Sequence, residues 1–229
     1  MNCVILQPAF IPWRGYFHLI QKADVFIFYD DVQFDKHGWR NRNRIKGSNG
    51  SFWLTIPVLT KGTTSQGIKI KDVIIDNQQR WKRKHLASIE QAYSKAPHYK
   101  SFRDAIQEIY SMDTESISSF TINAVIMISE LLGISDVRFV KSSELCVTGD
   151  KTGRLVEIVK ETGADHYISG PSAREYIQQD QFHESGITLE YMEYNYPEYE
   201  QLHPPYDPQL SILDLLFMKG QDAHRYIWG

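Results

Sequence analysis

The chain has 229 residues, 42% of them hydrophobic, which suits one α/β domain over residues 1–229 with a substantial core. Its formal net charge of −3 argues against a dedicated nucleic-acid binder, so no nucleic-acid partner is expected. Its two cysteines, Cys3 and Cys146, offer neither a disulfide framework nor the spacing of a zinc site. The sequence has no long apolar run and no secretory signal, so we expect a cytoplasmic protein with no integral membrane segment.

The N-terminal residues predict a buried strand, a loop and a helix. Residues 3–6 are apolar and end at Gln7-Pro8, and residues 16–23 have a helical pattern. A strand that runs through a glycine-containing loop into a helix N-terminus presents backbone N–H groups to phosphate or carboxylate. We therefore expect this loop to bind a ligand. Its candidate binding residues are Gln7, Phe10, Trp13, Gly15 and Tyr16.

A second strand, over residues 25–29, ends in the paired acids Asp30 and Asp31. Open α/β sheets bind ligands at the carboxyl ends of their strands. A carboxylate there could act as general base toward an amine or a sugar hydroxyl, or hold Mg²⁺ with phosphate oxygens. A solvated turn or an N-cap is the alternative. Tandem side chains project in different directions, so we expect one acid to be functional, favouring Asp31, and we include Gln33 as a substrate contact.

Residues 39–44 alternate arginine and asparagine after a tryptophan. In an extended segment the three arginines would share one face and the two asparagines the other. Arginine presents a planar fork to phosphate or carboxylate, and asparagine can bind sugar hydroxyls. A solvated charge run is the alternative. The candidate binding residues here are Trp39, Arg40, Asn41, Arg42, Asn43 and Arg44.

The middle of the chain predicts two more strands and then a helical block. Residues 51–58 read as a strand, and residues 68–75 alternate in the manner of a half-exposed strand. From residue 78 to 133 the hydrophobic period becomes helical, which predicts a helical block or insert. Within it we expect a helix that ends before Pro97, one over residues 101–112, and one that Asp113 or Thr114 caps and Gly133 ends.

His85 lies on the apolar face of the first helix in this block, at four-residue spacing from Trp81 and Tyr93. An imidazole in that place is either a core histidine with a satisfied partner or a proton acceptor, and the sequence leaves both open. Lys84 and Tyr93 are candidate substrate contacts, although a basic run here is also typical of a solvated helix face.

The last third returns to alternating strands and helices. We expect strands at residues 137–141, 166–169 and 187–194, and helices at residues 152–161, 173–178 and 210–217. This order predicts a mainly parallel, Rossmann-like sheet flanked by helices.

A second anion-binding helix N-terminus is predicted where the strand at 166–169 ends and Ser172 caps a helix. The stretch lacks the G-x-S-x-G spacing of a nucleophile, so its serines are expected to bind ligand rather than attack it. Ser211 as a cap and Asp214 in the first turn of the last helix need no functional role. The candidate binding residues of this third are Ser169, Gly170, Ser172, Tyr176 and Gln201.

Several segments of the chain resemble those of a known protein family. QPAFIPWRGYF, FYDDVQF, GWRNRNRI and SILDLLF together resemble the WbqC-like protein family of bacteria, and the similarity continues at LTIPV, KHLASIEQAYSKAP, GADHYISGPSAREYI and YEQLHPPYDPQLSILDLL. The resemblance implies a setting in surface-polysaccharide loci and sugar modification by amino-acyl transfer to an amino sugar. The opening strand, loop and helix also resemble nucleotidyltransferase-like folds. Those enzymes carry paired histidines around the glycine, where this chain has Trp13 and Tyr16, and that departure opposes adenylyl transfer.

Three functions are therefore compatible with the sequence. The first is a transferase that moves an acyl or amino-acyl (glycyl-type) group to a nucleotide-linked or lipid-linked amino sugar, with the arginines on a diphosphate or carboxylate and Asp31, His85 or Asp30 as proton acceptor. The second is a nucleotidyl-transferring or adenylate-forming ligase. The third is a non-catalytic glycan-binding or assembly factor, because 13 tyrosines and five tryptophans can build a glycan pocket. Mg²⁺ and a nucleotide are compatible cofactors, no residue is assigned to a metal, and a homo-oligomer is compatible with the sequence.

Overall fold

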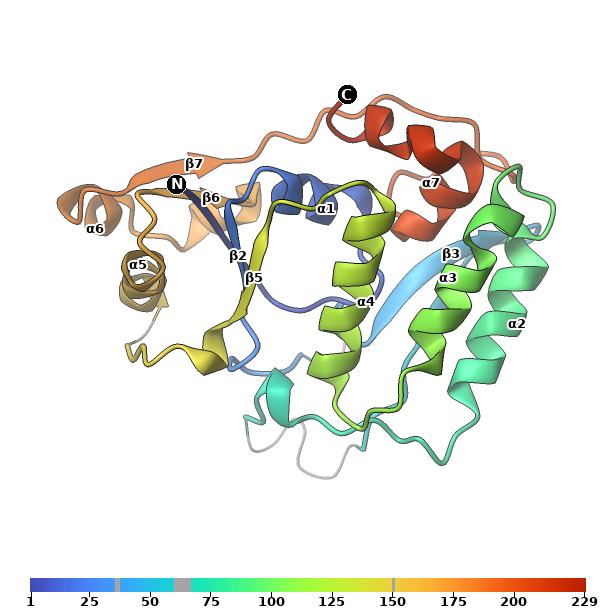
Figure 1. Ribbon diagram of the computed structural model, residues 1–229, viewed down its shortest axis with the longest axis horizontal. Helices are drawn as coiled ribbons and strands as arrows, with labels where there is room; N and C mark the ends of the chain where they lie inside the picture. Colours follow the sequence, from blue (N-terminus) through green and yellow to red (C-terminus); the bar gives the residue numbers. More distant parts are fainter. Residues whose placement is uncertain (36–37, 60–66, 150) are drawn as a thin grey trace.

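The structure, a computed structural model, describes residues 1–35, 38–59, 67–149 and 151–229. Its centre is a five-stranded sheet in the order β5-β2-β1-β6-β7, in which each neighbouring pair is parallel (Figure 1). The strands are β1 (Asn2–Leu6), β2 (Val25–Phe28), β5 (Arg138–Lys141), β6 (His166–Ser169) and β7 (Thr188–Tyr191). This order confirms the predicted Rossmann-like α/β fold.

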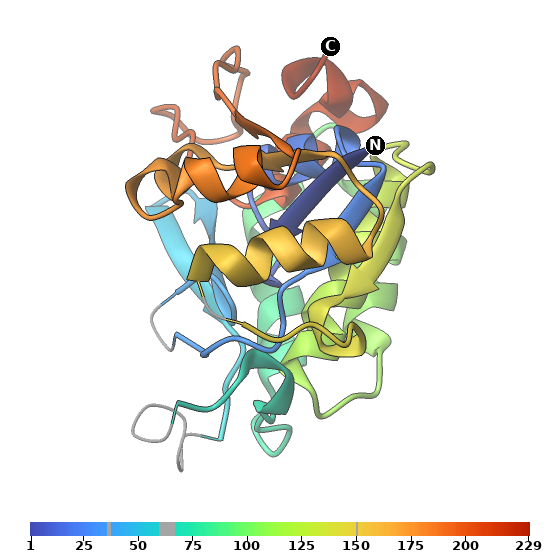
Figure 2. The ribbon, with the colours of Figure 1, turned by 90° about the vertical axis from the view of Figure 1, so that its left-hand side faces the viewer.

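The two central strands are buried on both faces because their side chains alternate between two apolar layers. Val4 and Phe26 pack toward α1 and α4, whereas Cys3 and Val25 pack toward α5 and α6. Figure 2 shows α5 and α6 in front of the sheet, on the side away from α4. The helices of these layers are α1 (Arg14–Gln21), α4 (Ile117–Leu131), α5 (Lys151–Glu161) and α6 (Gln179–Glu184).

The predicted helical block consists of α4 with two helices beyond it, α2 (Trp81–Tyr93) and α3 (Tyr99–Ser111). Helix α2 packs on a separate antiparallel hairpin, and α3 packs on the last helix. That hairpin is formed by β3 (Arg42–Gly47) and β4 (Gly50–Thr55), and the last helix is α7 (Ile212–Lys219). The buried side chains of the block join those of α1 in one apolar core, so the block is packed into the same core as the sheet.

Residues 68–75 do not form the predicted strand. A 3₁₀ turn, η1 (Ile70–Asp72), stands there because its backbone is anchored to the segment after β2. The amide of Ile70 donates to the carbonyl of Val32 at 2.9 Å, and the amide of Lys71 donates to that of Asp30 at 2.8 Å. These two hydrogen bonds do not follow the regular spacing of a β-ladder. Around the turn, the described residues form isolated β-bridges only.

Two details of the helices also differ from expectation. The predicted helix at 173–178 is a 3₁₀ turn, η3 (Pro171–Glu175), and the short α6 that follows was not predicted. Helix α4 is capped by Ser116, whose Oγ accepts from the amide of Ser119 at 3.2 Å, and not by Asp113 or Thr114. The remaining 3₁₀ turns are η2 (Ser142–Glu144) and η4 (Gly220–Tyr226).

Candidate functional site

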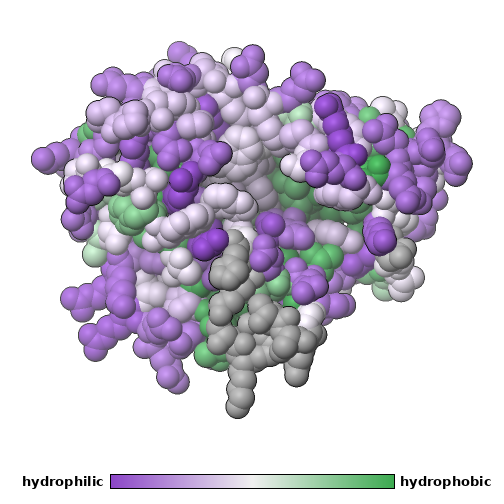
Figure 3. All heavy atoms as spheres, turned by 180° about the vertical axis from the view of Figure 1, so that it is seen from behind, coloured by the Kyte–Doolittle hydropathy of each residue, from purple (hydrophilic) through white to green (hydrophobic). Residues whose placement is uncertain are grey.

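A cleft of about 1200 Å³ lies at the carboxyl ends of β1 and β6. The chain order in the sheet reverses between these two neighbouring strands, which is the point where open α/β sheets bind ligands. The cleft walls come from the end of β1 with the loop to α1, the end of β6 with η3, the start of α5, and the segment before β3. Seen from behind, the molecule is hollowed, with hydrophobic surface set between hydrophilic rims (Figure 3).

The charged side chains on the cleft wall are both cationic. Arg40 and Lys151 line it, and no aspartate, glutamate or histidine does so among the described residues. Burial lowers the pKa of Arg40, and its buried Nε has no hydrogen-bond partner in the described part of the chain. Seven aromatic residues complete the wall: Trp13, Tyr16, Tyr29, Trp39, Tyr167, Tyr176 and Tyr194. Cations beside aromatic rings suit an anionic ligand with flat or apolar parts.

The first loop has a different local geometry from the one its sequence predicted. A Cβ added at Gly15 would lie 2.3 Å from a ring carbon of Trp13, so glycine is needed there for the indole to pack. The Trp13 ring also meets Tyr194 edge-on at 4.9 Å between centroids. Tyr16 donates its hydroxyl to the carbonyl of Gln7 at 3.1 Å. The loop therefore contributes side chains to the cleft, whereas Phe10 is fully buried in the core behind it.

Asp30 is a structural residue. It is 2% exposed, and its carboxylate accepts hydrogen bonds from the Oγ of Ser143 at 2.9 Å and the amide of Ser143 at 3.1 Å, with the Oγ of Ser142 3.3 Å away. Ser118 of α4 also reaches it, at 3.5 Å. These contacts hold the end of β2 to η2 and α4, so the predicted catalytic use of Asp30 has no geometric basis.

Asp31 forms an ion pair with Arg154 of α5 and accepts a 2.6 Å hydrogen bond from the Oγ of Ser142. Burial alone would raise the pKa of Asp31, but the bonds from Arg154 and Ser142 outweigh it and the pKa is lowered. The guanidinium of Arg154 also lies 5.1 Å from the centroid of Tyr29, whose ring lines the cleft. Asp31 itself stands behind that wall, next to the cleft and not on its surface.

The alternating segment divides its residues among three environments. Arg40 enters the cleft. Asn41 and Asn43 are buried and donate to backbone carbonyls, Asn41 to Ile56 at 2.9 Å and Asn43 to Ile11 at 2.7 Å. The Asn43 amide thus holds the hairpin to the first loop, and the Asn41 amide holds the segment before β3 to the residue after β4. Both amide donors are used within the chain, and Asn43 also borders the cleft. Arg42 and Arg44 lie over Trp53 on the outer face of the hairpin, whereas Arg40, expected on the same face, lies in the cleft before β3 begins.

His85 is a core histidine. It is 5% exposed, with Nδ1 3.3 Å from the Tyr110 hydroxyl and Nε2 3.1 Å from the carbonyl of Thr55. Burial lowers its pKa to about 4, with a small opposing contribution from the Thr55 carbonyl. Both ring nitrogens are engaged and His85 is not among the residues that line the cleft, so this geometry favours the packing alternative over the catalytic one. Lys84, one residue earlier, is exposed on the outside of α2.

Two other predicted binding residues belong to a buried polar group beneath α7, which we call the α7 cluster. It consists of Lys46, Tyr93, Tyr199, Gln201 and Asp214. Tyr93 and Tyr199 donate to the Asp214 carboxylate at 2.9 and 2.8 Å, and the Lys46 ammonium donates to Gln201 at 3.1 Å. Tyr93 and Gln201 thus stabilise the fold of the C-terminal segment and do not reach the cleft. Ser211 caps α7 as predicted.

At the end of β6, Ser169, Gly170, Ser172 and Tyr176 all line the cleft. The local structure differs from the prediction, because η3 has no side-chain cap and Ser172 is exposed within it. Gln33 is exposed and pairs in an isolated bridge with Lys69, outside the cleft wall.

Sequence reasoning missed several residues of the cleft wall: Tyr29, Lys151, Gln178, Tyr194 and Gln209. Lys151 begins α5 directly after β5 and η2, the same strand-to-helix arrangement that singled out the first loop, so its signal was present. Its φ of 43° is in the left-handed region, which is unusual for a residue other than glycine. Gln209 and Tyr194 reach the cleft by tertiary folding of the C-terminal segment and had no local signal.

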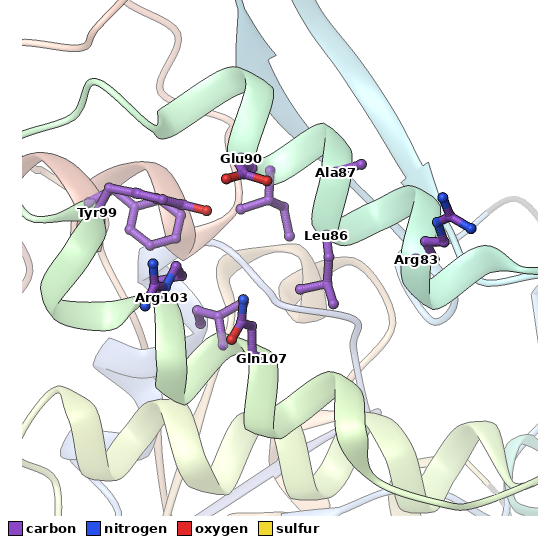
Figure 4. Close-up of a pocket in the computed structure, with 10 residues that line it drawn as sticks. Arg83, Leu86, Ala87, Glu90, Tyr99, Arg103 and Gln107 are labelled. Atoms are coloured by element: carbon purple, nitrogen blue, oxygen red, sulfur yellow. The ribbon is translucent and has the colours of Figure 1, made fainter.

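A second, smaller hollow of about 400 Å³ lies between α2 and α3 (Figure 4). Leu86 and Glu90 of α2 face Tyr99, Arg103 and Gln107 of α3 across it. It contains charges of both signs, and it holds none of the predicted site residues. Within the described ranges no group of three or more His, Cys, Asp or Glu could hold a metal ion, and no helix is long and apolar enough to cross a membrane.

Comparison with known proteins gives two matches. The model of the WbqC-like protein family matches residues 7–226. The chain is also 40% identical over 225 residues to the uncharacterized protein Rv1507c of Mycobacterium tuberculosis (strain ATCC 25618 / H37Rv), covering 97% of this chain and 96% of that protein. No solved structure matches.

Proposed function

The chain belongs to the WbqC-like protein family, and from this premise we propose that its cleft binds a nucleotide-linked or lipid-linked amino sugar for acyl or amino-acyl transfer. Family membership suggests a setting in polysaccharide loci. The observation that carries the proposal is the cleft at the strand-order reversal, which has cations and aromatic rings but no described carboxylate on its wall. A diphosphate-linked sugar has matching chemistry: two or more negative charges next to a ring with apolar faces.

In this proposal Arg40 and Lys151 hold the diphosphate from two sides of the cleft. Arg40 comes from the segment before β3 and Lys151 from the start of α5, so the two cations converge from elements that are far apart in sequence. A partly dehydrated arginine with a lowered pKa gains most from a charge-assisted hydrogen bond. Trp13, Trp39 and Tyr194 supply ring faces for the sugar or the base.

Asp31 and Arg154 act as positioning residues in the proposed site. Their ion pair holds α5, which carries Lys151, and places a guanidinium against the Tyr29 ring on the cleft wall. Burial raises the pKa of Tyr29, and it raises the pKa of Tyr194 to about 12, so both hydroxyls stay protonated near neutral pH and serve as hydrogen-bond donors. Neither tyrosine serves as the proton acceptor for an incoming amine.

The first loop weighs against the adenylate-forming alternative. In the arrangement that such enzymes share, a glycine allows close approach of phosphate, but here the Trp13 indole occupies the space over Gly15. The non-catalytic alternative has one specific observation in its favour: the described cleft wall offers no carboxylate or imidazole as a general base. Binding and transfer therefore have to be measured separately.

The first measurement is a thermal-shift panel with ATP, CoA, acetyl-CoA, UDP-sugars, dTDP-amino sugars and a short polyprenyl-diphosphate sugar, each with and without Mg²⁺. A ligand that binds the folded state raises the melting temperature by mass action. We expect a shift with an amino-sugar diphosphate that is lost in Arg40→Met and Lys151→Met. Lys84→Met, which changes an exposed lysine outside the cleft, is the matched control and should respond like the parent chain.

A shift with ATP alone would favour the ligase reading, and no shift with any sugar diphosphate would contradict the proposal. For a ligand that does bind, mass spectrometry after incubation with acyl donors separates the two remaining functions. A gain in mass on the sugar supports transfer, and binding without a gain supports an assembly factor.

A further inference from the structure

Two partly exposed tryptophans lie side by side at the β3–β4 hairpin, Trp39 just before β3 and Trp53 in β4. Trp39 is 44% exposed and Trp53 is 43% exposed, and their ring centroids lie 5.4 Å apart at an interplanar angle of 40°. Exposed apolar side chains that adjoin one another can mark an interaction site, whereas isolated ones are common on protein surfaces. The pair forms a shallow apolar surface beside the cleft.

Two guanidinium groups border this surface. The Arg42 Cζ lies 4.4 Å from the Trp53 ring centroid and the Arg44 Cζ lies 5.9 Å from it, and Arg44 is directly opposite Trp53 in the strand register. Arg44 is also 3.6 Å from the carboxylate of Asp207. Arg44 is thus paired with that carboxylate, and Arg42 places a second guanidinium against the same indole. We call Trp39, Trp53, Arg42 and Arg44 the hairpin platform.

The platform is continuous with the cleft. Trp39 belongs to both, since it lines the cleft and packs on Trp53. Gln209 connects them a second time: it lines the cleft, and its Oε1 accepts from Arg44 Nη2 at 3.1 Å. A chain of sugars that leaves the cleft along this side therefore passes over the exposed indoles.

We propose that the hairpin platform binds an acidic saccharide, with pyranose rings on the faces of Trp39 and Trp53 and a sugar carboxylate on Arg42 and Arg44. Exposed aromatic rings offer flat apolar contact to the C–H faces of a pyranose, and arginine pairs with carboxylate through two parallel hydrogen bonds. The proposal extends the cleft function to a substrate class, a sugar-linked ligand whose glycan carries a uronic or sialic acid next to the end held in the cleft. The placing of the acidic sugar next to the end held in the cleft rests on the proposed function.

The test uses the indole N–H signals of the five tryptophans in a two-dimensional NMR titration of the full chain. The probes are sialyllactose and a galacturonic acid trisaccharide, with lactose and galactotriose as neutral matches. We expect both acidic probes to shift the Trp39 and Trp53 signals, and to leave the buried Trp81 and the C-terminal Trp228 in place. The neutral matches should bind about tenfold more weakly, because they lack the charge-assisted bonds.

Variants decide which side chains are responsible. Trp53→Ala and Arg42→Ala should each weaken binding of the acidic probes about tenfold, and Trp53→Phe should restore part of the loss. Arg83→Ala removes an exposed arginine on α2 and should leave binding within about twofold of the parent chain. An unchanged melting temperature for each variant shows that the fold is retained.

Absence of any shift with both acidic probes would overturn the platform, as would equal binding of acidic and neutral probes or a response at Trp13 in place of Trp53. None of these results touches the cleft proposal, which depends on sugar-diphosphate binding and on Arg40 and Lys151. Conversely, loss of diphosphate binding with an intact platform response would overturn the cleft function and leave the saccharide site standing.

Discussion

The cleft and the α7 cluster contain similar side chains and use them in opposite ways. In the α7 cluster, the Lys46 ammonium and the Asp214 carboxyl are buried with tyrosine and glutamine partners in hydrogen-bond contact. In the cleft, Arg40 and Lys151 line a wall on which no described carboxylate stands, although the nearby Asp35 partly offsets the effect of burial on the pKa of Arg40. Charged groups held by several hydrogen bonds within the chain stabilise the fold, and cations on a concave surface that has no acidic side chain of its own suit an anionic ligand.

The largest effect expected from this contrast is on stability, at Asp214. Replacing Asp214 with alanine leaves two buried tyrosine hydroxyls without their acceptor and removes the carboxyl group near the Lys46 ammonium. We expect the free energy of unfolding to fall by about 3 kcal/mol. Urea denaturation measures it, with Tyr199→Phe as a milder variant that removes one hydroxyl. A loss below about 1 kcal/mol would mean that the cluster is not a stabilising unit.

At Arg40 the effect should appear in binding and not in stability. Arg40→Met removes a partly dehydrated cation but keeps an apolar stem of similar size. The affinity for a sugar diphosphate should fall by about 2 kcal/mol, the scale of a charge-assisted hydrogen bond. The free energy of unfolding should stay the same or rise. Calorimetric titration and denaturation of the same variant separate the two, and a destabilised Arg40→Met would place this residue with the α7 cluster instead.

His85 provides a pH-dependent test. Its pKa of about 4 in the folded state lies below the ordinary histidine value of 6.5, so the unfolded chain binds the proton first as pH falls. The contribution of His85 to stability is therefore complete above pH 6.5 and is lost as pH falls toward 4.

His85→Gln should remove this slope and lower the free energy of unfolding at pH 7 by about 1.5 kcal/mol, because two hydrogen-bond contacts are disturbed. Denaturation at a series of pH values checks both. Any transferase activity should survive the substitution when it is assayed well below the melting temperature. Complete loss of turnover in a folded His85→Gln protein would return His85 to the catalytic residues.

The smallest effect belongs to Lys84. It is exposed on α2, outside both the cleft and the α7 cluster. Lys84→Ala should change stability by less than about 0.5 kcal/mol and leave sugar-diphosphate affinity unaltered. Measured beside Arg40→Met, it shows whether a cation matters because of its place or simply because of its charge.

Much of the fold could be predicted from the sequence, because its signals are local. The apolar runs at β1 and β2, the helical period from residue 81 to 131 and the strand at His166–Ser169 depend on residues near one another in the chain. Residues 68–75 alternate as a strand would, but their backbone partners, Val32 and Asp30, come from a separate segment, so no strand forms there. A β-strand requires a neighbouring strand to pair with, as well as an alternating sequence.

The sequence also determined which residue types were available at the site: two acids after β2, arginines alternating with asparagines before and within β3, and a serine–glycine end on β6. Only the tertiary structure decided the destination of each. Asp30 is held by Ser142 and Ser143, Asp31 by Arg154, and Asn43 by the carbonyl of Ile11, all across long stretches of chain. A buried polar group is hydrogen-bonded to a partner that the fold brings next to it, and the neighbouring sequence does not show which partner that is. The same packing left Arg40 and Lys151 on the cleft wall, and so separated residues that bind from residues that hold the fold.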